Sequence, residues 1–299
     1  MESNYAVEIT GLKKNYGPVQ AVRGVNLAVK KGEILGFLGP NGAGKTTTIR
    51  CLLDLIRPQA GKIRILGIDP VKDPVAVRAK TGYLPGELHL EGNQTVEAAL
   101  NYFNELRGRK SSRQEISALA ERLDLNLKAP IKNLSKGNKQ KVGLVQALMG
   151  QPELLLLDEP TSGLDPLMQQ EVYTLLREAQ AAGATVFFSS HIISEVEAIA
   201  GRVAIIRDGV IVEEADPAQL ATMALRRYRV RFRTPVDPEP LTAVAGTSLI
   251  RRESAHEVIL QVEGEVDRFL KILAAFPVSD LQSEHLSLEE IFLTFYQKE

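Results

Sequence analysis

The feature that most constrains the fold is the stretch GPNGAGKTT, residues 39–47, which directly follows the apolar run EILGFL. That run has the length and continuous apolar character of a buried strand, and TTTIRCLLDLI, after Lys45, carries apolar residues at helical spacing out to Ile56. Glycines without side chains let the intervening loop wrap with its N–H groups pointing inward, and the following helix N-terminus adds partial positive charge. The stretch therefore predicts a strand–loop–helix unit that cradles phosphate.

The loop also fits the pattern G-x-x-x-x-G-K-[ST]. In this pattern Lys45 reaches the β and γ phosphates of a nucleotide, and the Thr46 hydroxyl ligates a magnesium ion. A glycine-rich turn could match by chance, but the strand before it and the helix after it argue against chance. The nucleotide-binding residues predicted here are Gly39, Pro40, Asn41, Gly42, Ala43, Gly44, Lys45, Thr46 and Thr47.

A second element, PELLLLDEP, places two carboxylates after a strand that is apolar on both faces. Side chains at the carboxyl end of a central parallel strand face the ligand crevice. We expect Asp158 to hold magnesium and Glu159 to polarise the water that attacks the γ phosphate. The alternative is that the two acids only cap the next helix.

Four further short motifs lie before and after the Asp158 strand. LSKGNKQK (residues 134–141) precedes the Asp158 strand, SGLD (residues 162–165) and SSH ending in His191 follow it, and Tyr16 lies in KKNYG. Together with the loop and the acidic pair, this set resembles the ATP-binding cassette (ABC) ATPases over about residues 5–215. The four motifs resemble that family's signature motif, D-loop, switch-histidine loop and adenine-stacking aromatic.

The resemblance implies that Ser135 and Gly137 of one copy close on the ATP bound by another copy. The residues carry local signals as well. Ser135 is a good N-cap, before a helix with Val142, Val145, Leu148 and Met149 on one face. Asp165 is an N-cap before Pro166, at the start of a helix that contains Leu167, Val172, Leu175, Leu176 and Ala179 and is ended by Gly183. A capping role and a nucleotide role are compatible at both positions.

His191 follows the apolar run ATVFFSS, so it too is expected at the crevice end of a buried strand. A neutral imidazole there can donate a hydrogen bond to the γ phosphate. The implied catalytic set is Glu159, His191 and Lys45, and the implied metal ligands are Thr46 and Asp158. Tyr16 would stack on adenine, although it could instead pack at a strand end.

Two departures from the family pattern stand out. The signature has Lys136 and Asn138 where many members have glycine and glutamine. In TGYLPGE, Gly86 stands near the position where the family usually has a glutamine that senses magnesium and the attacking water. Gly86 has no side chain for this role, so Glu87 or a water molecule would have to take it. An exposed glutamate in a turn is usually only solvated.

The fold class expected from these elements is α/β. It comprises a P-loop core with a mainly parallel sheet flanked by helices, an N-terminal antiparallel β subdomain, a helical insertion at about residues 85–145 and a small α+β C-terminal domain. We place the ATPase domain at residues 1–221 and the accessory domain at 222–299. Within the first, TVEAALNYFNEL and RQEISALAERL predict the helices of the insertion, and Asp208-Gly209 predicts a hairpin. The insertion is the face on which a membrane partner would dock.

In the C-terminal part, RRYRVRFRT alternates apolar residues with arginines, HEVILQVEG predicts a strand and VDRFLKILAAF a helix. We interpret the face with Arg229, Arg231 and Arg233 as a solvated basic edge, although it could touch anionic headgroups or a second copy. Ser287 and Glu290 predict a capping box for a last helix in LSLEEIFLTFY. This LSLEEIF segment resembles the ends of the drug- and antibiotic-exporter ATPases of the daunorubicin-resistance type.

Composition narrows the partners and the compartment. Lys and Arg (36) nearly balance Asp and Glu (37), so nothing in the overall charge favours a nucleic-acid partner. The single cysteine, Cys51, cannot form an internal disulfide, and no N-terminal signal pattern is present, which favours a reducing compartment. No window has the apolar length of a membrane span. Together with these signals, the resemblance to the ABC ATPases implies a chain at the cytoplasmic face of a membrane, held there by a separate permease.

Two functions from different classes fit the motifs. The first is a transporter ATPase that binds ATP and Mg²⁺, dimerises with a second cassette, identical or not, and drives a membrane-spanning permease, as an exporter. The second is a soluble ABC-type mechanoenzyme acting on ribosomes or DNA. A single P-loop argues against the ribosomal type, and short helices in place of a long coiled coil argue against the chromosomal type. A GTPase is disfavoured because NKQK lacks the aspartate that reads guanine. The sequence favours the transporter ATPase.

Overall fold

The computed structural model describes residues 3–90, 92–108, 110–217, 226–262 and 266–284. The chain divides into two compact units, residues 1–217 and 218–299. The first holds all the predicted nucleotide-site residues. In the described parts of the chain, no helix combines the length and apolarity that crossing a membrane requires.

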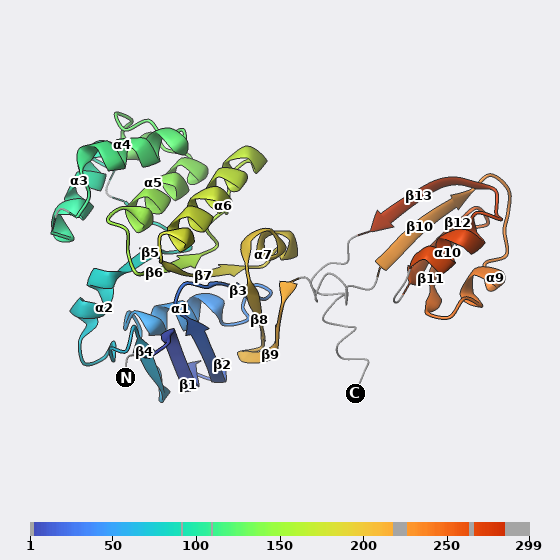
Figure 1. The fold of residues 1–299 in the computed structure, drawn as a ribbon, viewed down its shortest axis with the longest axis horizontal. Helices are drawn as coiled ribbons and strands as arrows, with labels where there is room; N and C mark the ends of the chain where they lie inside the picture. The colour runs from blue at the N-terminus through green and yellow to red at the C-terminus, as the bar shows by residue number, and fades with distance from the viewer. Residues whose placement is uncertain (1–2, 91, 109, 218–225, 263–265, 285–299) are drawn as a thin grey trace. The chain divides into compact units, whose positions relative to one another are not determined.

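A six-stranded sheet forms the centre of the first unit (Figure 1). Its first five strands run parallel and the last pairs antiparallel with its neighbour. All residues of the three central strands β6, β7 and β3 are buried, because the sheet is covered on both faces. The expected mainly parallel α/β core is confirmed. In spatial order the strands are β5 (Thr81–Leu84), β6 (Leu154–Asp158), β7 (Thr185–Ser190), β3 (Ile34–Leu38), β8 (Arg202–Arg207) and β9 (Val210–Ala215).

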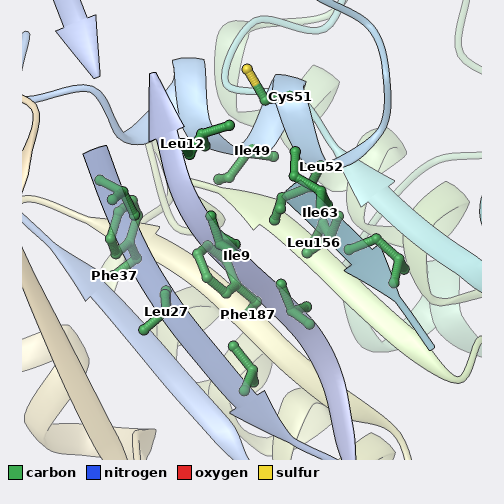
Figure 2. Packing of buried hydrophobic residues seen from close by; sticks show 14 of the residues in the cluster. Ile9, Leu12, Leu27, Phe37, Ile49, Cys51, Leu52, Ile63, Leu156 and Phe187 are labelled. Atoms are coloured by element: carbon green, nitrogen blue, oxygen red, sulfur yellow. The ribbon is translucent and has the colours of Figure 1, made fainter. Parts of the chain in front are cut away.

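The predicted N-terminal antiparallel region is a three-stranded sheet, β2-β1-β4, made of β1 (Tyr5–Tyr16), β2 (Val19–Lys30) and β4 (Ala60–Ile65). Its apolar face packs on the central sheet through one shared core. Figure 2 shows Ile9 and Leu27 from this small sheet beside Phe37 and Phe187 from the large one. The two phenylalanine rings lie 5.3 Å apart, centroid to centroid. This core fixes the strand that enters the phosphate loop.

Helices cover both faces of the central sheet. Helix α1 shares the core with the small sheet, whereas α5 and α6 lie on the opposite face (Figure 1). Two helices of the insertion begin at side-chain caps, Thr95 for α3 and a Ser112–Glu115 capping box for α4. The helices are α1 (Lys45–Leu52), α2 (Pro74–Lys80), α3 (Val96–Leu106), α4 (Arg113–Arg122), α5 (Lys136–Leu148), α6 (Pro166–Ala181) and α7 (Ile193–Ile199), with a 3₁₀ turn η1 (Ile131–Asn133).

One local expectation in this unit was wrong. Helix α1 ends at Leu52 rather than near Ile56, because Asp54 adopts a left-handed conformation with φ +50° that stops the helix. Leu167, one of the apolar residues quoted for α6, is 78% exposed. It lies five residues before Val172, which puts it about 140° around the helix from that buried side chain.

The second unit is a four-stranded antiparallel sheet with helices packed on one face. Its strand–helix–strand–strand–helix–strand order is that of the split βαβ motif. The core joins alternate residues of β10 and β12 to Phe269, whose ring stacks on Tyr228 with centroids 5.2 Å apart. The elements are β10 (Arg226–Phe232), α9 (Glu239–Thr242), β11 (Thr247–Ser254), β12 (Glu257–Val262), α10 (Val266–Leu273) and β13 (Val278–Glu284).

The interpretation of β10 as a basic edge strand was wrong. β10 lies inside the sheet, in the order β11-β12-β10-β13, and pairs with β12 on one side and β13 on the other. Arg229 and Arg231 both form ion pairs with Glu257 on the neighbouring strand. Strands β11 and β13 had no counterpart in the predicted elements. The helix predicted from Ser287 and Glu290 lies outside the described residues.

Candidate nucleotide site

The phosphate loop connects β3 to α1, as the sequence predicts. Gly44 has φ +106°, and a Cβ there would lie 2.4 Å from the Ala21 carbonyl oxygen, so this position accepts only glycine without rearrangement. The N–H groups at the start of α1, on Lys45 and Thr46, have no acceptor within the helix. Because the exposed residues Asn41 and Gly42 leave the loop open to solvent, these donors are available to an anion.

Lys45 lies inside this loop and is only 5% exposed. Its Nζ donates to the carbonyl oxygens of Gly39, at 2.7 Å, and Pro40, at 3.1 Å, and lies 3.9 Å from Glu159 Oε1. Burial lowers the pKa of the Lys45 ammonium, and the charges of Glu159 and Asp158 partly offset this effect. The loop thus holds a buried cation whose hydrogen-bond acceptors are two neutral carbonyl oxygens, and phosphate oxygens would bind it more strongly.

Asp158 ends the buried strand β6 and is 1% exposed. Both its carboxylate oxygens are engaged: Thr46 Oγ1 donates to Oδ2 and Ser189 Oγ donates to Oδ1, each at 2.6 Å. A hydroxyl and a carboxylate that meet at the edge of a phosphate loop form an oxygen donor set of the kind Mg²⁺ prefers. The predicted metal ligands Thr46 and Asp158 therefore lie together, and their chemistry fits the ion.

Glu159 follows with φ +51°, a left-handed conformation that is uncommon for a glutamate. Its N–H donates to Ser189 Oγ at 3.0 Å and to the Ser189 carbonyl oxygen at 3.2 Å, which holds this backbone against the end of β7. Its Oε1 lies 3.0 Å from Nδ1 of His191, whose ring is partly exposed. Thus Lys45, Thr46, Asp158, Glu159 and His191 form one contiguous group at the carboxyl edge of the sheet.

Gly86, after β5, lies directly beside this group. A Cβ at Gly86 would stand 3.1 Å from Asp158 Oδ2 and 3.4 Å from its Cγ. The side chain of Glu87 is exposed. Gly86, near which the resemblance places a glutamine, is therefore adjacent to the predicted metal ligand Asp158 and presents backbone alone.

Ser135 and Gly137 lie at the start of α5. Ser135 is the N-cap, with Oγ accepting from the Asn138 N–H at 3.2 Å. A Cβ at Gly137 would lie 2.6 Å from the carbonyl oxygen of Gly163, so this glycine allows the signature segment to touch the D-loop backbone. Asp165, just after Gly163, caps α6 by accepting from the N–H groups of Leu167 and Met168, each at 3.1 Å.

Tyr16 stands at the end of β1 and is 46% exposed. The ammonium of Lys14 lies 5.2 Å from the centre of its ring. Within the described part of the chain, no contact joins this ring to the group formed by Lys45, Glu159 and His191. An exposed aromatic face beside a cation suits stacking on a base better than packing in a core.

Two residues of this site had not been predicted. Ser189 bridges Asp158 and the Glu159 backbone, and the only available signal was its place at the end of a buried strand, as the first residue of the quoted SSH. Gln140, 4% exposed on α5, donates to the carbonyl oxygens of Glu159, at 2.9 Å, and Pro160, at 3.2 Å. No sequence pattern marks Gln140 for that role.

Comparison with known proteins agrees with this geometry. A family model described as "ABC transporter" matches residues 22–162. The "Nod factor export ATP-binding protein I" of Paraburkholderia xenovorans is 32% identical over 98% of both chains. The "Bacitracin transport ATP-binding protein BcrA" of Bacillus licheniformis is 39% identical over 70% of this chain and 69% of that protein. A "Daunorubicin resistance ATP-binding protein DrrA3" of Streptomyces coeruleorubidus is 35% identical over 72% and 69%.

Solved structures give the same picture. The ATP-binding subunit of an ABC transporter has a TM-score of 0.66 and 29% identity, covering 72% of this chain and 93% of that one. A dimeric ATP-binding cassette bound to ADP and Pi shares the fold, with a TM-score of 0.62, 24% identity, and coverage of 71% of this chain and 98% of that one.

The chain belongs to the ATP-binding proteins of ABC transporters. It is an ATPase of that family, and the expected resemblance to drug- and antibiotic-exporter ATPases is confirmed. None of the relatives described here favours the soluble mechanoenzyme.

Proposed function

We propose that this ATPase binds MgATP, pairs with a second cassette and powers a separate membrane-spanning permease that exports its cargo from the cytoplasmic face of the membrane. The observation that carries the proposal is the contiguous group of Lys45, Thr46, Asp158, Glu159 and His191 beside an open phosphate loop. The relatives named for export of Nod factor and for daunorubicin resistance support the direction of transport.

Nucleotide binding follows from the loop. The N–H groups of residues 41–47 and the Lys45 ammonium would surround the β and γ phosphates, which would take the place of the Gly39 and Pro40 carbonyl oxygens as partners of Lys45. Tyr16 would stack on adenine. Thr46 and Asp158 would hold Mg²⁺, which when bound neutralises phosphate charge. Because the Thr46 hydroxyl donates to Asp158, these side chains have to separate slightly to admit the ion.

Hydrolysis needs a base for the attacking water, and Glu159 would take that role. Its carboxylate would accept the water's proton, and its left-handed backbone, held by Ser189, keeps the side chain at the sheet edge. His191 Nδ1 lies within hydrogen-bond reach of Glu159 Oε1, which orients both groups. The imidazole's remaining nitrogen would then be free to contact the γ phosphate.

Pairing with a second cassette follows from the signature segment. Ser135 and Gly137 lie at a helix N-terminus. In a dimer of cassettes this N-terminus would face the phosphates bound by the other copy, with Asp165 and the D-loop beside it. A dimeric cassette among the structural neighbours supports this arrangement. We favour two identical copies, while a different cassette with the same motifs would complete the site equally well.

The permease would dock where the helical insertion meets the core. A cavity of about 440 Å³ lies between α2, β5 and α3, lined mainly by apolar side chains. Three of them are unusually exposed for their type, Leu55 at 48%, Val75 at 74% and Leu106 at 67%. An apolar cleft with an exposed apolar rim suits a hydrophobic element of a membrane protein. No basic field over the whole chain points to a nucleic-acid partner instead.

The test is Glu159→Gln in the full chain. Turnover should fall at least about 10²-fold, the low end for loss of a general base, while ATP remains bound and the protein elutes as a dimer. Light scattering with bound-nucleotide analysis measures both properties. Glu153→Gln, at the opposite end of the same strand, is the matched control and should behave as wild type. A Glu159→Gln protein that binds ATP yet stays monomeric would overturn the sandwich dimer.

A further inference from the structure

A buried carboxylate that has not been described above links the loop of Glu159 to the loop of His191. Glu195, on α7, is 6% exposed. Its Oε1 accepts from Thr161 Oγ1, and its Oε2 accepts from Ser190 Oγ at 2.5 Å. Hydrogen bonds to an ionised acceptor are about twice as strong as neutral ones, and inside a protein they are costly to lose. Both oxygens of Glu195 are therefore committed to two hydroxyls from different segments.

Those segments are the ones that carry the proposed catalytic groups. Thr161 stands two residues after Glu159 in a turn closed by the Ser162 N–H, which donates to the Glu159 carbonyl oxygen at 3.1 Å. Ser190 directly precedes His191. The Ile192 N–H donates to Ser190 Oγ at 2.9 Å, so one hydroxyl brackets His191 on both sides. Glu195 holds that hydroxyl in place.

The charge of Glu195 acts on its surroundings as well. Burial, with a smaller contribution from the Glu195 charge, raises the pKa of Tyr173 to about 12. Tyr173 is 4% exposed and lies on α6, the helix that follows the D-loop. The carboxylate thus stands at the junction of the Glu159 loop, the His191 loop and α6.

We propose that Glu195 is a positioning residue that couples the loop of Glu159 to the loop of His191 and keeps the two side chains correctly placed relative to each other during hydrolysis. This inference rests on the proposed roles of Glu159 and His191. A glutamine at position 195 can accept from only one of the two hydroxyls, because its amide nitrogen donates; the other hydroxyl would have to accept from that nitrogen instead. Both links then become neutral hydrogen bonds and one of them is reversed, which weakens the coupling while the shape of the side chain is retained.

The experiment measures steady-state ATP turnover of the full chain for Glu195→Gln and for Glu197→Gln. Glu197 is exposed on the same helix, so its variant is a matched control with the same chemical change. Glu195→Gln should lower kcat roughly tenfold with KM within about twofold, since misplacement of catalytic groups by a fraction of an ångström affects the transition state rather than binding. Glu197→Gln should leave both constants unchanged.

A double-mutant cycle with His191→Ala separates positioning from structure. If Glu195 acts through His191, adding Glu195→Gln to His191→Ala should lower kcat by less than about twofold further. Full additivity, or a wild-type kcat for Glu195→Gln, would overturn the inference. Should Glu195→Gln fail to fold, Ser190→Ala removes the same link to His191 and is read in the same cycle. If Glu159→Gln and His191→Ala themselves turn over normally, the proposed function fails instead.

Discussion

The two units of the chain use β-sheets in opposite ways. In the first, the central strands β3, β6 and β7 are parallel and buried on both faces, and their polar residues come only at the carboxyl ends. In the second, β10 and β12 alternate, with one apolar face under α10 and one polar face opposite. Each pattern follows from what covers the sheet.

This difference determines where chemistry can assemble. A parallel sheet brings the ends of several strands to one edge, so Asp158, Ser189 and the phosphate loop meet although they are far apart in sequence. An antiparallel sheet spreads its polar residues over a face instead. There, Arg229 and Arg231 are paired with Glu257 across neighbouring strands, and the neighbouring arginines lower the pKa of Glu257. The comparison predicts that ATP turnover depends on the first unit.

The largest effect is expected from Lys45→Ala. Removing the buried ammonium leaves no cation inside the loop, so nucleotide affinity should be lost and turnover should fall about 10²- to 10³-fold, as for loss of a preorganised donor. Fluorescent-nucleotide titration and a phosphate-release assay measure the two quantities. Lys62→Ala, on the exposed face of β4, is the control. Unchanged ATP affinity in Lys45→Ala would refute the role of Lys45.

The sharpest test of the comparison is Phe269→Ala. Phe269 is fully buried in the core of the second unit, so its truncation should destabilise that unit by about 3–5 kcal/mol. Turnover should remain near wild type, whereas calorimetry should show a lower melting temperature for one transition. Ile272→Ala, on the same helix but 37% exposed, should shift melting less. A proportional loss of turnover in Phe269→Ala would show that the units do not act separately.

A smaller effect is expected at Gly86. In Gly86→Ala the added Cβ crowds Asp158 Oδ2 at 3.1 Å, which should raise the Mg²⁺ concentration for half-maximal turnover by about tenfold. Gly86→Gln carries the same crowding but adds an amide oxygen, which is a hard oxygen ligand of the kind that suits Mg²⁺. It should therefore need less Mg²⁺ than Gly86→Ala. Identical magnesium titrations for wild type and both variants would remove any role for this position in metal binding.

The smallest effect concerns Cys51, which lies in the core of the first unit. Burial raises the pKa of its thiol to about 11, so at pH 8 the reactive thiolate is present at a fraction on the order of 10⁻³. A thiol reagent should therefore label the native protein slowly and the denatured protein at once. Phe269→Ala should leave the native rate unchanged. Faster labelling in that variant would mean that damage to the second unit opens the first.

Much of the site could be predicted because its signals are local. The loop glycines, Lys45 and the acidic pair lie within short stretches bounded by continuous apolar runs, and such runs indicate buried strands wherever they occur. The caps at Ser135 and Asp165 are equally local, since a cap bonds to N–H groups two or three residues away. Gln140 and Glu195 carried no such signal, because Gln140 bonds to backbone 19 and 20 residues away and Glu195 bonds to Thr161, 34 residues away.

By itself, the sequence determined the buried strands, the phosphate loop, the helix caps and the membership in the ABC ATPases, since each depends on neighbours along the chain. Only the tertiary structure decided that β10 is an interior strand, that Leu167 is exposed, and that a side chain at position 86 would meet Asp158. The physical reason is that strand pairing, burial and close approach are set by which distant segments meet. The type of a residue indicates such a long-range contact only where few other residue types could make it.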